Sequence, residues 1–310
     1  MRFNVAEDII ALTPEWKGER FPDGRPRVPD KYLDTIRTMT LEELWKPIFV
    51  KGYENQFLPM KSLHPEFKEN GELNCKMIGR AVTASYGPTR PDYYAASMAQ
   101  AASEGRHGTP NQWVIDSLVD RDVVVVDMYD KIYKGTFVGG NLTTAIKTRT
   151  HTGGAVIWGG IRDIEQMQKV DGINVYYRGV DPTPIRDFCM LGFNTPVRMG
   201  SGEHAALCLP GDVVYGCSGG VLFIPPQLVV EVVENGAKTQ IKDIFGFEMI
   251  TANRFSTAQI DMYTWTVEML DMLVDFIKTD PRGAPYRDID WSHEYDMAIN
   301  GDPNDNQSAL

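Results

Sequence analysis

The pattern of hydrophobic and polar positions divides the chain into three parts. Up to about residue 70, it predicts helices and loops, with apolar residues at helical spacing from Pro29 to Trp45. From Cys75 onward, segments typical of strands and helices alternate, and beyond Pro226 the pattern becomes helical again. We therefore predict an N-terminal helical arm (residues 1–70), an α/β core (71–226) and a C-terminal helical extension (227–310).

Two apolar runs define the centre of the predicted core. The runs DVVVVDMYD (122–130) and GGAVIWGG (153–160) are too continuously apolar for half-exposed strands, so we expect both to be buried on both faces. Between them, GTFVGG leads into NLTTAIKTRT, which predicts a glycine loop and a short helix. Arg162 and Asp163 follow the second strand directly, and ends of parallel strands are where α/β proteins place their chemistry.

Further segments predict the surrounding elements. The stretch CKMIGRAVTASYG predicts a strand, and PDYYAASMAQAASEGRHG predicts a helix that starts at Pro91 and ends near Gly105. GDVVYGCSGGVLFIP predicts two strands around a Ser-Gly-Gly turn, and TPVRMGSGE a loop. In the C-terminal extension, QLVVEVVENG and IDMYTWTVEMLDMLVDFIK each predict one helix. The tail from Thr279 is expected to lie along a surface or to fray.

Composition narrows the classes of function. The chain has 310 residues, 43% of them hydrophobic, and a formal net charge of −11, which opposes binding to nucleic acid or to anionic membranes. Charges and a proline interrupt the first twenty residues, so we expect neither a signal peptide nor a membrane span, and a cytoplasmic location. The four cysteines lack the spacing of a zinc site, and we expect them to be reduced and structural.

The glycine pair before the predicted helix is a candidate anion site. Gly139 and Gly140 precede Asn141 and Leu142, whose backbone N–H groups would be unpaired at the start of the helix. Such a start binds anions through these donors and the helix dipole. The alternative is a tight strand-to-helix turn that needs glycine for its backbone dihedrals.

The sequence GGIRD places a guanidinium beside a carboxylate. Arg162 can bind a carboxylate through two parallel hydrogen bonds, and Asp163 is a hard oxygen ligand suited to Mg²⁺ or Mn²⁺. Together they suit a small 2-oxo acid, whose cleavage requires stabilisation of an enolate. The alternative is an ordinary surface ion pair.

These motifs, in this order, resemble the RraA-like family. The resemblance runs from roughly Gly79 to Pro226 and rests on DVVVVD, VGGNLTTAIKTRT, GGAVIWGGIRD, VYYRGVDPTP and PGDVVYGCSGGVLFIP. The family holds 4-hydroxy-4-methyl-2-oxoglutarate aldolases, oxaloacetate decarboxylases and regulators of ribonuclease E activity. The N- and C-terminal extensions lie outside the resemblance or match it loosely, which suggests a distinct, long subgroup.

The resemblance implies a swivelling β/β/α-type core with a mixed sheet, assembled as a homotrimer or hexamer with active sites between subunits. It implies that Asp163 binds the metal, that Arg162 binds the substrate carboxylate, and that the backbone of residues 139–142 lines the pocket. Aldolases of the family commonly carry an acid where this chain has Gly140, which leaves the proton donor open.

Other site residues are implied with less detail. Aldolases of the family also use a carboxylate from a neighbouring subunit, for which Asp243 or Glu234 is the nearest counterpart. A solvated helix face is the alternative for each. Arg186 could hold a second acidic group of the substrate, or make a structural contact instead.

Three functions follow from these observations. The first is a divalent-metal-dependent lyase that cleaves a small 2-oxo acid through a pyruvate-type enolate, by aldol cleavage or by decarboxylation. The second is a non-catalytic regulator that binds another protein. A methyltransferase, a label that relatives often carry, is disfavoured because the chain lacks the glycine-rich loop and following acid of a Rossmann-like methyl-donor site.

Overall fold

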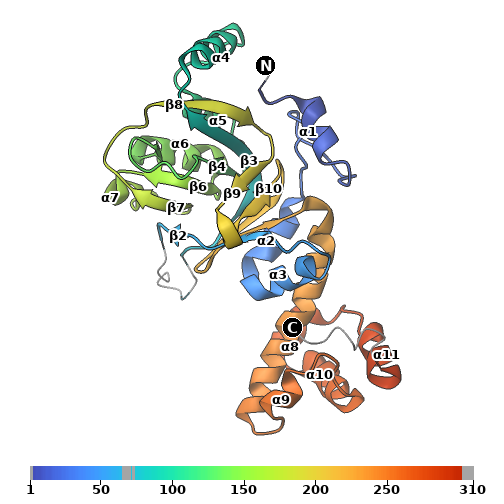
Figure 1. The fold of residues 1–310 in the computed structure, drawn as a ribbon. Helices are drawn as coiled ribbons and strands as arrows, with labels where there is room; N and C mark the ends of the chain where they lie inside the picture. Colours follow the sequence, from blue (N-terminus) through green and yellow to red (C-terminus); the bar gives the residue numbers. More distant parts are fainter. Residues whose placement is uncertain (1–2, 65–70, 72–73, 302–310) are drawn as a thin grey trace. The chain divides into compact units, whose positions relative to one another are not determined.

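The computed structural model describes residues 3–64, 71 and 74–301. It forms two compact units, Met1–Val232 and Val233–Leu310, which are described separately (Figure 1). The helices of the first unit are α1 (Ala6–Leu12), α2 (Asp30–Thr38), α3 (Leu41–Phe49), α4 (Pro91–Ser103), α5 (Pro110–Asp116), α6 (Gly140–Thr150) and α7 (Ile164–Met167), with 3-10 turns η1 (Gly202–His204) and η2 (Pro226–Leu228).

The first unit is built on a large mixed sheet. Its strands are β1 (Phe57–Leu58), β2 (Lys61–Ser62), β3 (Met77–Pro88), β4 (Asp122–Asp127), β5 (Thr136–Val138), β6 (Gly154–Ile161), β7 (Asn174–Val180), β8 (Phe188–Phe193), β11 (Val213–Cys217) and β12 (Gly220–Ile224). The strands β3, β4, β6 and β7 pair in parallel, whereas β11, β12, β8, β1 and β2 pair antiparallel. The predicted α/β fold with a mixed sheet is confirmed.

The valines of β4 explain why this strand lies at the centre. Val124 and Val126 belong to one hydrophobic core and Val123 and Val125 to the other, and all four are fully buried. Helices α5, α6 and α7 cover the first core (Figure 1). The second core lies under the hairpin of β9 (Val197–Met199) and β10 (Ala206–Cys208). The large sheet is therefore sandwiched between a helical layer and a two-stranded layer.

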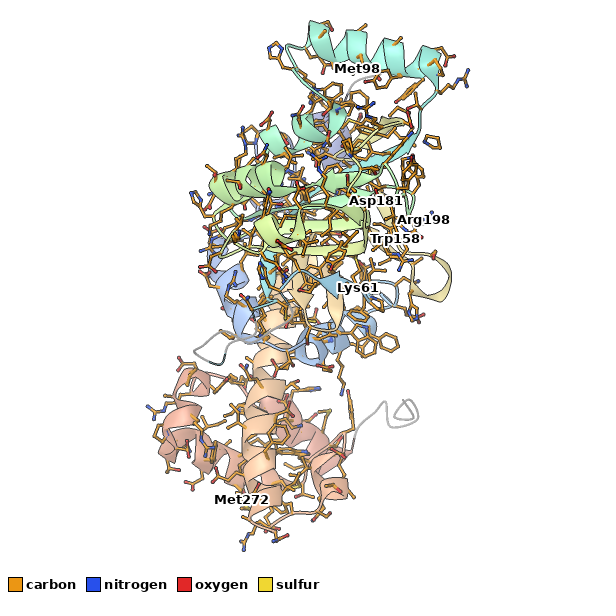
Figure 2. All side chains as sticks on the ribbon, turned by 90° about the vertical axis from the view of Figure 1, so that its left-hand side faces the viewer. Lys61, Met98, Trp158, Asp181, Arg198 and Met272 are labelled. Carbon is orange, nitrogen blue, oxygen red and sulfur yellow. The ribbon has the colours of Figure 1, made fainter. Side chains whose placement is uncertain are left out.

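The two-stranded layer corrects one sequence expectation. TPVRMGSGE was expected to be a loop, but its residues 197–199 form β9, which pairs with β10. Trp158 of β6 packs into the same core as Val197, and Figure 2 marks this region by Trp158 and Arg198. The reason is burial: Val197 and Met199 alternate with the exposed Arg198, which is the pattern of a half-buried strand.

The N-terminal arm is helical as expected, but it also contributes strands. β1 pairs with β12 and β2 pairs with β7, so the arm extends both ends of the sheet. The apolar spacing from Pro29 to Trp45 is split into α2 and α3. The break lies at Thr40, whose side chain accepts a hydrogen bond from the Glu43 backbone N–H and so caps α3.

A buried ion pair attaches this arm to the sheet. The Arg25 guanidinium is 1% exposed, and its Nη1 lies 2.9 Å from Oδ1 of Asp122, the first residue of β4. Burial raises the pKa of the Asp122 carboxyl above its ordinary value, and Arg25 offsets part of this effect. The Asp122 charge is thus compensated inside the protein.

The second unit is a helical cluster. Its elements are α8 (Val229–Thr251), whose first residues belong to the first unit, α9 (Thr257–Ile260), α10 (Val267–Thr279), η3 (Pro281–Tyr286) and α11 (Ser292–Asn300). Its core includes Phe245, Trp265, Leu273 and Phe276. In the described part of the chain, no helix combines the length and apolarity needed to span a membrane.

Two expectations for this region were wrong. The helix expected to end at Gly236 continues to Thr251. The helix expected from Ile260 begins only at Val267, because the Thr266 side chain caps α10 by accepting from the Met269 backbone N–H. The tail, expected to lie along a surface or to fray, forms η3 and α11, which both contact α10; residues 302–310 lie outside the described part.

Candidate functional site

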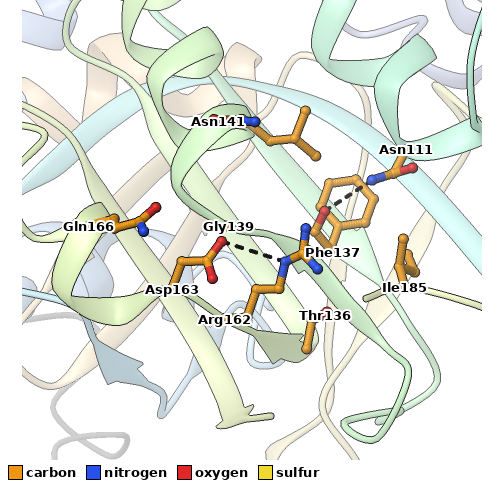
Figure 3. Close-up of a pocket in the computed structure, with 10 residues that line it drawn as sticks. Asn111, Thr136, Phe137, Gly139, Asn141, Arg162, Asp163, Gln166 and Ile185 are labelled. Carbon is orange, nitrogen blue, oxygen red and sulfur yellow. Dashed lines mark hydrogen bonds and ion pairs between the residues drawn. The ribbon is translucent and has the colours of Figure 1, made fainter. Parts of the chain in front are cut away.

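A pocket opens where β5 and β6 end and α6 begins. Its volume is about 460 Å³, counting the part that is open to solvent. Figure 3 shows the side chains that converge on it, with Arg162 between Asp163 on one side and Phe137 and Asn111 on the other. The lining residues are Asn111, Thr136, Phe137, Gly139, Asn141, Leu142, Arg162, Asp163, Gln166 and Ile185.

Arg162 and Asp163 lie at the centre of this pocket. The Arg162 Nε is 3.6 Å from Asp163 Oδ2, and the two side chains are 37% and 38% exposed. The same Asp163 oxygen accepts a hydrogen bond of 3.3 Å from the Gly140 backbone N–H at the start of α6. The carboxylate therefore lies against the positive end of a helix, which stabilises its charge. Both side chains remain accessible to a ligand.

Asp163 has an unusual backbone conformation. Its φ of 56° and ψ of 39° lie in the left-handed region, directly before α7. Aspartate tolerates this region better than most residues, but the conformation is still less favourable than for glycine. Nine other described non-glycine residues also have a positive φ, so the conformation fixes where the Asp163 side chain points but does not by itself assign it a function.

The two glycines are explained by neighbouring side chains and not by their dihedrals. Gly139 has φ −143° and ψ −163°, which is extended backbone, and Gly140 is helical. A Cβ atom on Gly139 would lie 2.3 Å from Asp163 Oδ2, and one on Gly140 would lie 2.6 Å from Gln166 Oε1. The alternative of a turn that requires glycine dihedrals is therefore not what the structure shows. The glycines make room for Asp163 and Gln166.

Several lining residues were not found by sequence reasoning. Asn111 comes from α5 and donates from Nδ2 to the Phe137 carbonyl at 3.1 Å. Thr136 donates from its hydroxyl to the Thr183 carbonyl. Gln166 lies on α7, three residues after Asp163, and its backbone N–H donates to the Asp163 carbonyl at 3.0 Å. That spacing is the one signal in the sequence that could have pointed to Gln166.

Some of the expected site residues line the pocket, and others do not. The pocket brings together Gly139, Asn141, Leu142, Arg162 and Asp163, with the Gly140 N–H bonded to Asp163. By contrast, the lining includes Ile185 but not the exposed Arg186. Asp243 and Glu234 lie on α8 in the second unit.

The chemistry of the lining fits a hard divalent cation. Its possible ligands are oxygen atoms: the Asp163 carboxylate and the side-chain carbonyl of Asn141. Among the described residues, no group of three or more His, Cys, Asp or Glu side chains could hold a metal. One carboxylate with an amide oxygen suits Mg²⁺ or Mn²⁺, which retain several waters, and does not suit zinc.

A family model matches the part of the chain that holds this pocket. The family model RraA-like, described as Aldolase/RraA, matches residues 50–223, which is more than half of the chain. No curated protein matches the chain.

Solved structures share the fold. A protein described as uncharacterized, from Pseudomonas syringae pv. tomato str. DC3000, is 16% identical, with a TM-score of 0.56 over 78% of this chain and 98% of its own. An unusual member of the RNase ES inhibitor RraA protein family from Streptomyces coelicolor is 19% identical, with a TM-score of 0.53 over 72% of this chain and 97% of its own. A structure described under novel cellulases from gut-associated microbes is 19% identical, with a TM-score of 0.55 over 76% and 94%.

Proposed function

Because this chain belongs to the RraA-like family, we propose that it is a divalent-metal-dependent carbon–carbon lyase acting on a small 2-oxo acid. The observation that carries this proposal is the convergence of Arg162, Asp163 and the start of α6 in one pocket. A permanent cation, a hard oxygen ligand and free backbone donors are the groups needed to bind a 2-oxo carboxylate.

Each residue has a defined part in this proposal. Arg162 binds the substrate carboxylate through its guanidinium, which has five donors and no acceptor. Asp163 would hold Mg²⁺ or Mn²⁺, and the ion would supply Lewis-acid stabilisation of the charge that develops on the 2-oxo oxygen. The backbone N–H groups of Asn141 and Leu142, at the start of α6, favour the same negative charge.

Residue 140 is glycine, so the proton that converts the pyruvate-type enolate to product must come from another group. Among the described lining residues, Arg162 and Asp163 are the only charged side chains. Arg162 stays protonated at all relevant pH values and Asp163 is engaged as a ligand. We propose that the proton comes from water in the pocket, and that Asp243 of a neighbouring subunit orients it within a homotrimer or hexamer.

The test is metal-dependent release of pyruvate from oxaloacetate and from hydroxy-oxo diacids. We expect activity with Mg²⁺ or Mn²⁺, loss of activity with a chelator, and at least a 100-fold lower kcat/KM in Arg162→Ala and in Asp163→Ala. Arg149→Ala is the matched control, since Arg149 lies at the other end of α6 and pairs with Asp116 outside the pocket. Full activity of both pocket variants would refute the proposal.

A second candidate is a non-catalytic regulator that binds another protein. The observation that favours it is glycine at residue 140, the first residue of α6, where aldolases of the family commonly carry an acid. Titration with Mg²⁺ and oxalate, a mimic of the pyruvate enolate, separates the two candidates. A lyase binds oxalate together with the metal and loses this binding in Asp163→Ala, whereas a docking protein has no need of either ligand.

A further inference from the structure

Gln166 occupies the space of the side chain that residue 140 lacks. It lies on α7, lines the pocket and faces the start of α6 (Figure 3). A Cβ atom on Gly140 would lie 2.6 Å from Gln166 Oε1 and 3.2 Å from Gln166 Cβ. With a methyl group at residue 140, the Gln166 amide would have to turn away and its Cβ would have to shift by a few tenths of an ångström. Glycine at 140 therefore leaves the Gln166 side chain free to take its observed position.

The backbone gives no separate reason for glycine at position 140. The residue is the first of α6 and has helical geometry, which L-amino acids adopt readily. The contact that distinguishes glycine here is therefore the one with the Gln166 side chain.

The Gln166 amide is available to a ligand. Asn111 and Thr136 already donate their side-chain hydrogen bonds to backbone carbonyls of Phe137 and Thr183. The Gln166 side chain is exposed, and the structure shows no hydrogen bond from its amide to any described residue. An amide offers two N–H donors and a carbonyl acceptor, and it carries no charge at any pH.

We propose that Gln166 is a specificity-determining residue that donates a hydrogen bond to a second carboxylate of the substrate. This inference rests on the proposed function. Figure 3 shows Arg162, Asp163 and Gln166 in that spatial order along one side of the pocket. With the first carboxylate on Arg162 and the 2-oxo group beside Asp163, the far end of the substrate extends toward Gln166. This role had been expected of Arg186, which does not line the pocket.

The experiment compares two substrates in three proteins. Wild type, Gln166→Ala and Gln166→Glu are assayed with oxaloacetate, which has a second carboxylate, and with a 4-hydroxy-2-oxo monocarboxylate. We expect kcat/KM for oxaloacetate to fall about 10-fold in Gln166→Ala and about 100-fold in Gln166→Glu, where two carboxylates repel each other. For the monocarboxylate we expect changes of less than about 3-fold in either variant.

Oxalate binding keeps this inference separate from the proposed function. Oxalate is too short to place a second carboxylate near Gln166. Its metal-dependent Kd should therefore be the same in both Gln166 variants as in wild type. If wild type binds oxalate but Gln166→Ala slows both substrates equally, or neither, the role of Gln166 is refuted and the lyase proposal stands. If wild type shows neither oxalate binding nor turnover, the proposed function itself fails, and the role of Gln166 fails with it.

A packing measurement tests the steric half of the inference without relying on activity. Gly140→Ala should lower the melting temperature or displace Gln166, because the new methyl group meets the Gln166 amide. Gly140→Ala/Gln166→Ala should recover the lost stability. If Gly140→Ala is equally tolerated with and without Gln166, the two positions are not coupled and the reciprocal arrangement is refuted.

Discussion

Asp163 combines a left-handed backbone with a contact to the start of α6. Its φ of 56° places a non-glycine residue in the left-handed region. Its Oδ2 accepts a hydrogen bond from the Gly140 N–H, and the residue lines the pocket. A glycine would be more relaxed in this conformation, but it would remove the carboxylate that we propose holds the metal.

The left-handed backbone of Asp163 leads to a prediction about substitutions at this position. Asp163→Gly and Asp163→Asn both remove the carboxylate that we propose binds the metal, but only glycine relieves the left-handed backbone. We expect Asp163→Gly to be more stable than Asp163→Asn by roughly 0.5–1 kcal/mol in urea unfolding. Neither variant should bind Mg²⁺ with oxalate. A less stable glycine variant would show that the conformation is not strained.

The sequence was informative about residues only where the chemistry is local. Arg162 and Asp163 were predicted because they are adjacent and follow a buried strand. Gly139 and Gly140 were identified as the start of a helix, as the structure shows, but the alternative of a turn that needs glycine dihedrals is not what the structure shows. The contact between Gly140 and Gln166 joins residues 26 positions apart, so no local pattern could reveal it.

At the scale of elements, the N-terminal arm depends on a buried charge pair. Arg25 and Asp122 are 1% and 0% exposed and connect the arm to the first residue of β4. A buried pair contributes little net stability, but loss of one partner leaves an uncompensated charge. Replacing Arg25 or Asp122 alone should therefore destabilise the folded protein, whereas replacing both together should destabilise it much less.

We expect Arg25→Met to lower the free energy of unfolding by about 3–5 kcal/mol at pH 8. Without Arg25, the pKa of Asp122 in the folded protein rises further above its unfolded value, because only the hydrogen bond from the Val119 backbone N–H still offsets the effect of burial. The folded variant then binds a proton more tightly than the unfolded chain, so its stability increases as the pH falls. Urea unfolding at pH 8 and at pH 5.5 measures both effects.

The paired substitution is the control for this prediction. Arg25→Met/Asp122→Asn removes both charges and retains an oxygen that can accept the hydrogen bond from the Val119 backbone N–H. It should recover most of the lost stability and show no added dependence on pH. A double variant as unstable as Arg25→Met would mean that packing of Arg25, and not its charge, holds the arm.

Elements with a strong hydrophobic period were predictable, and those defined by caps or by long-range pairing were not. The strands β4 and β6 and the helix α6 lie where the apolar runs place them. The break between α9 and α10 escaped because Trp265 maintains the apolar spacing, although its indole N–H donates to the Ile260 carbonyl outside α10. The strands β1 and β2 have two residues each, too few for any period.

At the scale of the molecule, the family match and the pocket both lie in the first unit. The match covers residues 50–223, and every residue that lines the pocket lies within that range. Asp243 belongs to the second unit, outside the match. Its proposed part in proton transfer therefore has to be tested on the assembled protein.

Mixing two inactive variants tests whether an active site is shared between subunits. Arg162→Ala removes the carboxylate-binding group, and Asp243→Asn removes the carboxylate proposed to come from the neighbour. If both groups meet only across an interface, random co-assembly at equal amounts should restore about a quarter of the sites, since each site needs an intact partner on both sides. Oxaloacetate turnover after unfolding and refolding the mixture measures this recovery, with each variant refolded alone as the control.

No recovery in oligomers that demonstrably contain both variants, or full activity of Asp243→Asn alone, would show that Asp243 is not part of the site. The proton would then have to be delivered by water held within the first unit, where Gln166 and Asn141 are the remaining side chains able to orient it.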